Sequence, residues 1–137
     1  MDDCEIEELS HTAEIGLRLA GPTLAGLFRC AALGMARLTG DAPSAGARSV
    51  RTVTLAAPDL ESLLVDWLNE LVYLAEVDAL YFDQVTIEEI SATALSALVG
   101  GRPVQEPPTV QVKAATYHQL SIRQDDAGWQ AEVFFDI

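Results

Sequence analysis

The last residues of the chain bring two anionic groups together after an apolar segment. Residues 133–137 read Val-Phe-Phe-Asp-Ile, so we expect the carboxylate of Asp136 and the terminal carboxylate of Ile137 to lie close together on an ordered strand. Two neighbouring anions need a compensating charge, because each disfavours ionisation of the other. A bound cation that takes oxygen ligands would supply that charge, and a nearby arginine or solvent is the alternative. The residue types alone leave both interpretations open.

A second candidate lies near the start of the chain, where His11 and Glu14 are separated by two residues. A histidine and a carboxylate at this spacing resemble a fragment of a metal-binding motif. The segment also has the pattern of a turn that enters a strand, in which His11 and Thr12 would make hydrogen bonds to the turn backbone. From the residues alone we favour this local role.

The two histidines also suggest an enzyme. His11 or His118 could act with Glu14 or Asp136 as the acid/base pair of a small hydrolase or isomerase. No glycine-rich phosphate loop accompanies these residues in the sequence, and no Ser or Cys carries the local signature of a nucleophile. We therefore predict a protein that is not an enzyme and keep the acid/base enzyme as the alternative.

Composition narrows the classes of partner. The 21 acidic and 8 basic residues give a net charge of −13, which a phosphate backbone would repel, so we do not expect direct nucleic-acid binding. No apolar run approaches the roughly 20 residues that cross a bilayer, and the acidic N-terminal segment does not resemble a targeting peptide. We predict a cytoplasmic protein without a membrane partner.

The two cysteines follow no metal-binding pattern. Cys4 and Cys30 lack a Cys-x-x-Cys spacing, and Cys30 lies in an apolar helical pattern where a buried free thiol is common. We therefore expect neither a zinc site nor a disulfide, which agrees with a cytoplasmic location.

Two helices and a series of strands must position these groups. Thr23 can cap a helix that reaches Leu38 and ends at Gly40, and Asp59 can cap a helix of about five turns. Alternation of apolar residues predicts a first strand at residues 14–19. Further strands are predicted at residues 50–55, 79–82, 85–90, 92–99, 110–115, 119–123 and 129–135, with a hairpin turn at residues 125–128.

This order of elements predicts an α+β fold in a single domain that spans residues 1–137. We expect a mixed or largely antiparallel sheet with the two amphipathic helices packed on one face. The polar side of the second helix carries Glu61, Asp66, Asn69 and Glu70, and we expect its acidic residues to face solvent instead of serving catalysis.

Four segments together resemble the archease family, small accessory proteins for RNA ligation. Archeases have a His-Thr-Ala-Asp-Ile-Gly motif, a leucine-rich helix with Trp-Leu-x-Glu-Leu, a Val-Lys-Ala-x-Thr-Tyr-His segment, and an Asp-Ile or Asp-Leu terminus. The corresponding segments here are residues 11–16, 63–71, 112–118 and 136–137. Because the four follow in order over essentially the whole chain, the combination is far more specific than any single match.

The resemblance implies a divalent metal site formed by Glu14, Asp136 and the terminal carboxylate of Ile137. The family usually has Asp at the position of Glu14, and the additional methylene moves the carboxylate by roughly 1.5 Å. A flexible calcium shell absorbs such a shift more easily than the strict octahedral geometry of magnesium. We therefore expect calcium, with magnesium or manganese as alternatives.

The resemblance further implies a non-enzymatic activator of a GTP-dependent tRNA-splicing RNA ligase. Archeases promote guanylylation of the active-site histidine of this ligase and restore its multiple turnover in tRNA splicing or RNA repair. Lys113 would contact the ligase or nucleotide phosphates, or else pair with a nearby acid, whereas Tyr117 and His118 would serve turn packing and hydrogen bonding. A chaperone-like interaction module is a further alternative.

Overall fold

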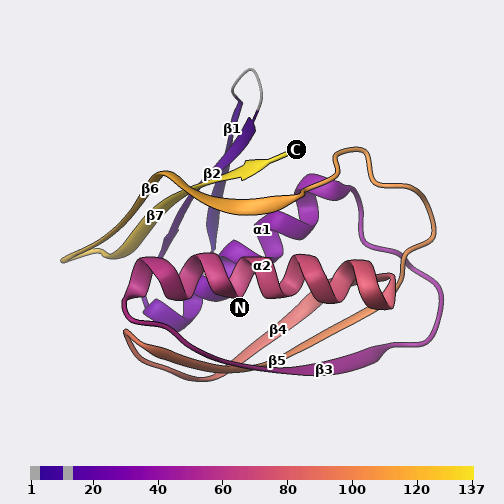
Figure 1. Cartoon of the computed structure of the whole chain (residues 1–137), viewed down its shortest axis with the longest axis horizontal. Helices are drawn as coiled ribbons and strands as arrows, with labels where there is room; N and C mark the ends of the chain where they lie inside the picture. The colour runs from indigo at the N-terminus through magenta and orange to yellow at the C-terminus, as the bar shows by residue number, and fades with distance from the viewer. Residues whose placement is uncertain (1–3, 11–13) are drawn as a thin grey trace.

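The computed structural model describes residues 4–10 and 14–137 and places both helices between two antiparallel sheets (Figure 1). One sheet has the strand order β1-β2-β7-β6, and the other has the order β3-β5-β4. The expected α+β class is confirmed, but the strands divide into two sheets rather than one. The elements are β1 (Glu5–Ser10), β2 (Glu14–Gly21), α1 (Leu24–Thr39), β3 (Ser49–Ala56), α2 (Leu60–Asp78), β4 (Leu80–Ile90), β5 (Ala94–Pro103), β6 (Ala114–Asp125) and β7 (Gly128–Asp136).

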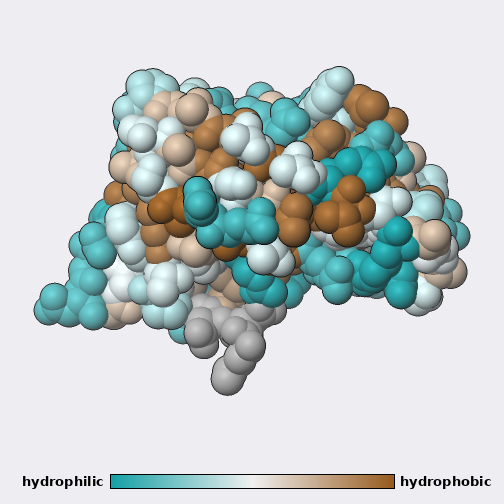
Figure 2. All heavy atoms as spheres, turned by 90° about the horizontal axis from the view of Figure 1, so that it is seen from below, coloured by the Kyte–Doolittle hydropathy of each residue, from teal (hydrophilic) through white to brown (hydrophobic). Residues whose placement is uncertain are grey.

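The burial of α1 explains why a single sheet was an incomplete prediction. This helix contacts β2 and β7 of one sheet and β4 of the other, so it buries most of its circumference. A helix that is apolar nearly all round must be covered on more than one side. The helices lie between the two sheets, and the open face of the three-stranded sheet carries hydrophobic patches among hydrophilic groups (Figure 2).

Both predicted helix starts are confirmed. The side chain of Thr23 accepts a hydrogen bond from the backbone N–H of Gly26 at 3.0 Å, and the side chain of Asp59 accepts one from Ser62 at 2.7 Å. These bonds satisfy donors that would otherwise have no partner in the first turn. Within the described ranges, neither helix combines the length and the apolar character that crossing a membrane requires.

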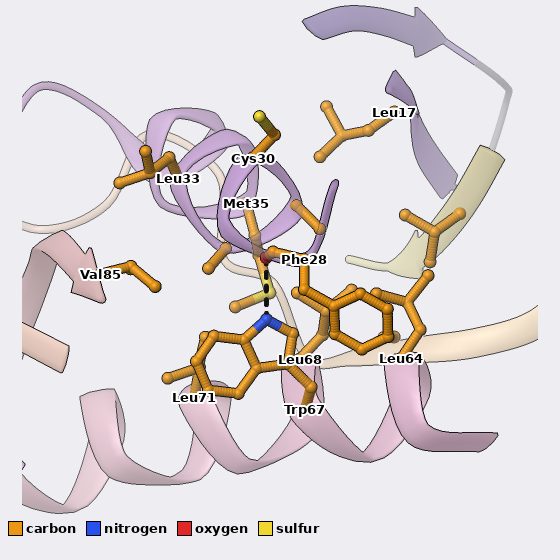
Figure 3. Packing of buried hydrophobic residues seen from close by; sticks show 14 of the residues in the cluster. Leu17, Phe28, Cys30, Leu33, Met35, Leu64, Trp67, Leu68, Leu71 and Val85 are labelled. Atoms are coloured by element: carbon orange, nitrogen blue, oxygen red, sulfur yellow. Dashed lines mark hydrogen bonds between the residues drawn. The ribbon is translucent and has the colours of Figure 1, made fainter. Parts of the chain in front are cut away.

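Trp67 joins the two helices at the centre of the core. Its indole N–H donates a hydrogen bond of 2.9 Å to the carbonyl oxygen of Phe28 on α1 (Figure 3). Both side chains are fully buried, so this donor would cost about 1 to 3 kcal/mol if it lost its acceptor. The bond therefore fixes where α2 crosses α1.

The expectation of two free thiols is wrong, because Cys4 and Cys30 form a disulfide. Residues 5–10 form strand β1, which the sequence analysis did not predict, and the pairing of β1 with β2 carries Cys4 to the side of α1. The Cα atoms of the two cysteines are 5.4 Å apart, within the range that a disulfide spans. Local sequence patterns gave no sign of this contact, since it depends on the position of an edge strand.

Several strand boundaries also differ from the prediction. The two strands expected between residues 79 and 90 are one strand, β4, with irregular pairing after Phe82 and after Ile87. Strand β5 continues through Gly101, where a side chain would collide with the backbone of Tyr81 on β4. Residues 110–113 lie outside a strand, and the predicted hairpin turn at residues 125–128 is confirmed.

Reduction of the disulfide should lower the free energy of unfolding by about 3 kcal/mol, because the cross-link closes a loop with a sequence separation of 26 and restricts the unfolded chain. Urea denaturation with and without a thiol reductant measures this difference. The matched control is Cys4→Ser, whose stability should not respond to the reductant. Identical unfolding curves of the oxidised and reduced parent would contradict the cross-link.

Candidate functional site

The pairing of β2 with β7 places Glu14 directly opposite Asp136. Residues that face each other across antiparallel strands point to the same side of the sheet, with Cβ atoms about 4.5 to 5.5 Å apart. Asp136 is exposed, and the Glu14 side chain is 19% exposed. The structure thus brings together two of the predicted site residues from nearly opposite ends of the chain.

Both carboxylates lie on the outer face of the four-stranded sheet, away from the helices. Ile15 and Leu17 on β2 and Phe135 on β7 pack into the core. Because side chains alternate along a strand, Glu14 and Asp136 point the opposite way. The candidate site is therefore open to a partner instead of enclosed in the core.

Phe134 forms an aromatic floor beside the two carboxylates. Its ring lies over Gly16, the residue opposite it on β2, and the side chain is 2% exposed. A Cβ at Gly16 would lie 2.6 Å from Cδ2 and 2.9 Å from Cζ of this ring, so the position admits no larger residue without displacement of Phe134. The glycine of the His-Thr-Ala-Glu-Ile-Gly motif thus makes room for an aromatic ring on the outer face.

A bulge in β6 brings His118 to the same place. Thr116 pairs with Phe134, but the next paired residue is Ser121, so residues 117–120 project from the ladder. The Thr116 hydroxyl accepts a 3.3 Å hydrogen bond from the backbone N–H of His118 and donates a 3.0 Å bond to the carbonyl oxygen of Phe134. The bulge is thereby held to β7.

The His118 side chain reaches across β7 to Glu14. Its Nε2 atom is 3.4 Å from Oε1 of Glu14, and its ring meets Phe134 edge-on with centroids 6.4 Å apart. His118 was predicted to serve turn packing, and this placement was missed because no local pattern indicates a four-residue bulge. His11, the other histidine considered, lies outside the described residues.

Arg18, on the outer face of β2, already has two carboxylate partners. Arg18 donates hydrogen bonds of 2.9 Å to Glu132 and 2.8 Å to Glu7, and these two carboxylates raise the pKa of its guanidinium. Across the ranges that the structure describes, neither Glu14 nor Asp136 forms a salt bridge with an arginine or lysine. Arg18 is thus paired with other carboxylates of the same sheet.

Lys113 lies beside Asp136 through its backbone. Its N–H donates a 2.8 Å hydrogen bond to the Asp136 carbonyl oxygen, and its exposed side chain makes no salt bridge with any described acid. The alternative of a structural pair with a nearby acid therefore has no support among the described residues. The exposed Lys113 side chain is thus without a carboxylate partner among the described residues.

Asn69 fastens the outer strand β6 to α2. Its side-chain amide donates a 3.2 Å hydrogen bond to the Ala115 carbonyl oxygen and accepts a 2.7 Å bond from the Ala115 N–H. Asn69 therefore uses the polar side of α2 to hold β6, a contact that the sequence did not predict. The amide supplies the two hydrogen bonds that a neighbouring strand would make at this edge of the sheet.

The donor set suits a hard cation but is incomplete without the chain terminus. Among the described residues, no three His, Cys, Asp or Glu side chains converge closely enough to hold a metal ion. Glu14 and Asp136 supply carboxylate oxygens, the ligands that calcium and magnesium prefer. The predicted terminal carboxylate of Ile137, the next residue along the chain, is the oxygen donor that would complete this set.

A cavity of about 840 Å³ lies elsewhere, between the carboxyl-terminal ends of the helices and the loops at residues 40–48 and 104–113. Neither Glu14, His118 nor Asp136 lines it. Tyr81 does, and its hydroxyl donates a 2.8 Å hydrogen bond to the Gly40 carbonyl oxygen, while burial raises the pKa of this phenol. The Glu14–His118 pair therefore lies outside this cavity, on an open face of the sheet, which disfavours the acid/base enzyme.

The fold and the site define a class of protein: an α+β domain with two helices between antiparallel sheets. A carboxylate pair lies where its second strand meets its last strand. The archease family model matches residues 6–137. Protein archease of Methanosarcina mazei is 41% identical over 138 residues, covering 96% of this chain and 94% of the relative, and that of Thermococcus kodakarensis is 31% identical with 96% and 97% covered. The chain belongs to the archease family.

Solved structures agree with this fold. The solution structure of Methanobacterium thermoautotrophicum protein 1598 superposes with a TM-score of 0.72 at 27% identity and covers 100% of both chains. The crystal structure of a Thermotoga maritima archease, described as a possible chaperone, gives a TM-score of 0.68 at 19% identity over 96% of each chain. The latter likeness concerns the fold alone.

Substitution Gly16→Ala should displace the Phe134 ring and lower the free energy of unfolding by about 1 to 3 kcal/mol, the usual cost of overpacking. Urea denaturation measures the change. In a Phe134→Ala background the same Gly16→Ala substitution should cost far less, since the ring is gone. Equal costs in the two backgrounds would show that the ring does not restrict position 16.

Proposed function

We propose that this protein is a non-enzymatic activator of a GTP-dependent RNA ligase and holds a divalent metal ion at Glu14, Asp136 and the terminal carboxylate of Ile137. The observation that carries the proposal is the cross-strand pairing of Glu14 with Asp136 on an open face, in a chain of the archease family. Two such anions without an arginine or lysine partner among the described residues favour binding of a cation.

Calcium is the ion that this donor set would bind best. Glu14 reaches further from its strand than an aspartate would, and calcium tolerates variable ligand positions at distances of about 2.3 to 2.6 Å. When bound, the ion would neutralise the carboxylates and offer positive charge to phosphate oxygens of the partner's nucleotide. Magnesium and manganese are the alternatives to be compared in the same titration.

The residues around the site present this ion instead of enclosing it. The buried Phe134 ring covers the outer face of the sheet next to the carboxylates, whereas Asp136 itself is exposed to water. The backbone of Lys113 is hydrogen bonded to Asp136, and its exposed side chain is available to contact the ligase or its nucleotide phosphates. Because the site is open, the ion would be accessible to a partner whose own histidine is guanylylated.

The charge of the chain supports a protein partner over an RNA partner. A net charge of −13 opposes contact with a phosphate backbone but complements the basic surface that an RNA-binding enzyme needs. We therefore propose that the ligase binds the RNA and this protein binds the ligase, to restore multiple turnover in tRNA splicing or RNA repair.

Substitution Asp136→Ala should reduce calcium affinity by roughly tenfold or more and abolish stimulation of multiple-turnover ligation, since loss of a ligand should cost at least as much as loss of a residue that orients one. Calorimetric titration and a ligation assay with excess RNA measure the two effects. Asp126→Ala, at the opposite end of the same hairpin, is the matched control and should change neither.

The outcomes of this experiment separate the parts of the proposal. Absence of any stimulation by the parent protein would overturn the activator role. Full stimulation by the Asp136→Ala variant would overturn the metal mechanism. Protection of unrelated unfolded proteins from aggregation, without an effect on the ligase, would instead support the alternative of a chaperone-like interaction module.

Addition of a single glycine after Ile137 should also weaken calcium binding, because it removes the charge from Ile137 and moves the terminal carboxylate by one residue, up to about 3.6 Å. Titration of the extended and parent chains measures this effect directly. Conversion of the new terminus to an amide separates the charge from the added length. Calcium affinities that do not differ among the three forms would exclude the terminal carboxylate from the ligand set.

A further inference from the structure

The cavity at the carboxyl-terminal ends of α1 and α2 has an apolar floor. Met35 of α1, Leu71, Val72 and Ala75 of α2, and Phe82 of β4 line it. Its volume of about 840 Å³ lies within the range of roughly 300 to 1,000 Å³ that is typical of ligand-binding pockets. The space can therefore accept a large apolar side chain with part of its backbone.

Exposed hydrophobic side chains gather beside this cavity. Val104 lines it and is 45% exposed, while Tyr73 and Val77, which are 59% and 61% exposed, lie one helical turn apart on α2 and flank the lining residues Val72 and Glu76. These are three of the six large hydrophobic residues exposed in the described ranges. Such grouping marks an interaction surface more than scattered exposure does.

The charged residues at the cavity favour a cationic partner. Asp41, Glu76 and Glu106 line it, against the single arginine Arg37 among its lining residues. This excess of carboxylates adds to the net charge of −13 and would repel phosphate groups, so RNA is disfavoured here as well. An apolar side chain with lysine or arginine on either side of it complements both the floor and the rim.

Hydrogen bonds hold the walls of the cavity in place. The backbone N–H and the hydroxyl of Thr109 both donate to the Thr39 carbonyl oxygen, at 2.9 and 3.2 Å, which ties the loop at residues 104–113 to the end of α1. Tyr81 fixes the neighbouring loop through Gly40. Because the walls are already positioned, a partner would bind without the entropic cost of ordering them.

The cavity and the proposed metal site are joined by a short stretch of the chain. Val112 lines the cavity, and the next residue, Lys113, is hydrogen bonded through its backbone to Asp136. One short segment thus separates the two surfaces, so a single protein partner can contact both.

We propose that this cavity is the docking site for a basic protein segment that inserts an apolar side chain between lysine or arginine residues. The proposal rests on the proposed function, since it assigns this segment to the RNA ligase. The cavity anchors the ligase, and the carboxylate site faces the ligase's nucleotide. The surface is distinct from the metal site in its residues and in its chemistry.

The test measures binding of the intact ligase to the full chain by biolayer interferometry. Glu76→Lys should weaken binding by roughly tenfold, mainly through slower association, because it reverses a charge at the rim. Asp66→Lys makes the same charge change at an exposed position of α2 outside the cavity and should alter binding less than about twofold. Both variants should retain the parent's calcium affinity.

A second variant, Ala75→Trp, fills the cavity and should weaken ligase binding by roughly tenfold or more. Thermal unfolding checks that each variant is folded, and Glu76→Lys stays informative if Ala75→Trp is not. Parent-like ligase binding by Glu76→Lys overturns the docking site, even where Asp136→Ala abolishes stimulation and the proposed function stands. Failure of the parent itself to bind the ligase overturns the proposed function instead.

Discussion

The antiparallel pairing of β2 with β7 is the constraint on which the site and its sheet depend. Eight residue pairs, from Glu14 with Asp136 to Gly21 with Trp129, join a strand near the start of the chain to the last strand. A slip of one residue would turn every side chain of one strand to the opposite face. The register therefore decides at once which residues fill the core and that the two carboxylates face outward together.

The sheet that carries this pairing is secured at both edges by contacts to the helices. On one side the Cys4–Cys30 disulfide joins the chain just before β1 to α1, and on the other side the Asn69 amide holds β6 to α2. The buried hydrogen bond from Trp67 then holds α2 against α1. Edge strands present unpaired backbone groups, and these contacts position both edges relative to the core.

The sequence predicted the helices well because their signals are local. Caps at Thr23 and Asp59 and apolar residues at helical spacing need no knowledge of the rest of the chain. The division into two sheets, the presence of β1 and the disulfide were missed, since each depends on which distant strands pair. Alternation within a strand shows that one face is buried but not which neighbour the strand has.

The site was predictable in proportion to how much of it resembled known motifs. Asp136 was indicated both by the two neighbouring anions at residues 136–137 and by the family resemblance, Glu14 was indicated chiefly by the resemblance, and the register then placed the two side by side. His118 lay in a matching segment, yet its approach to Glu14 depends on a bulge that no local pattern indicates. The cavity escaped prediction for the same reason, since two helix ends and two distant loops build it.

The charge of the molecule connects these surfaces to one mode of action. A chain with a net charge of −13 gains little from approaching RNA, so the proposed role in RNA joining requires a protein partner that carries the opposite charge. An open carboxylate pair meets that requirement only when a cation or a basic partner offsets it, whereas a preformed apolar cavity gives affinity that does not depend on charge. For the proposed activator, this combination favours association in which electrostatic attraction brings the partner close and apolar contact retains it, at an affinity that still allows release between turnovers.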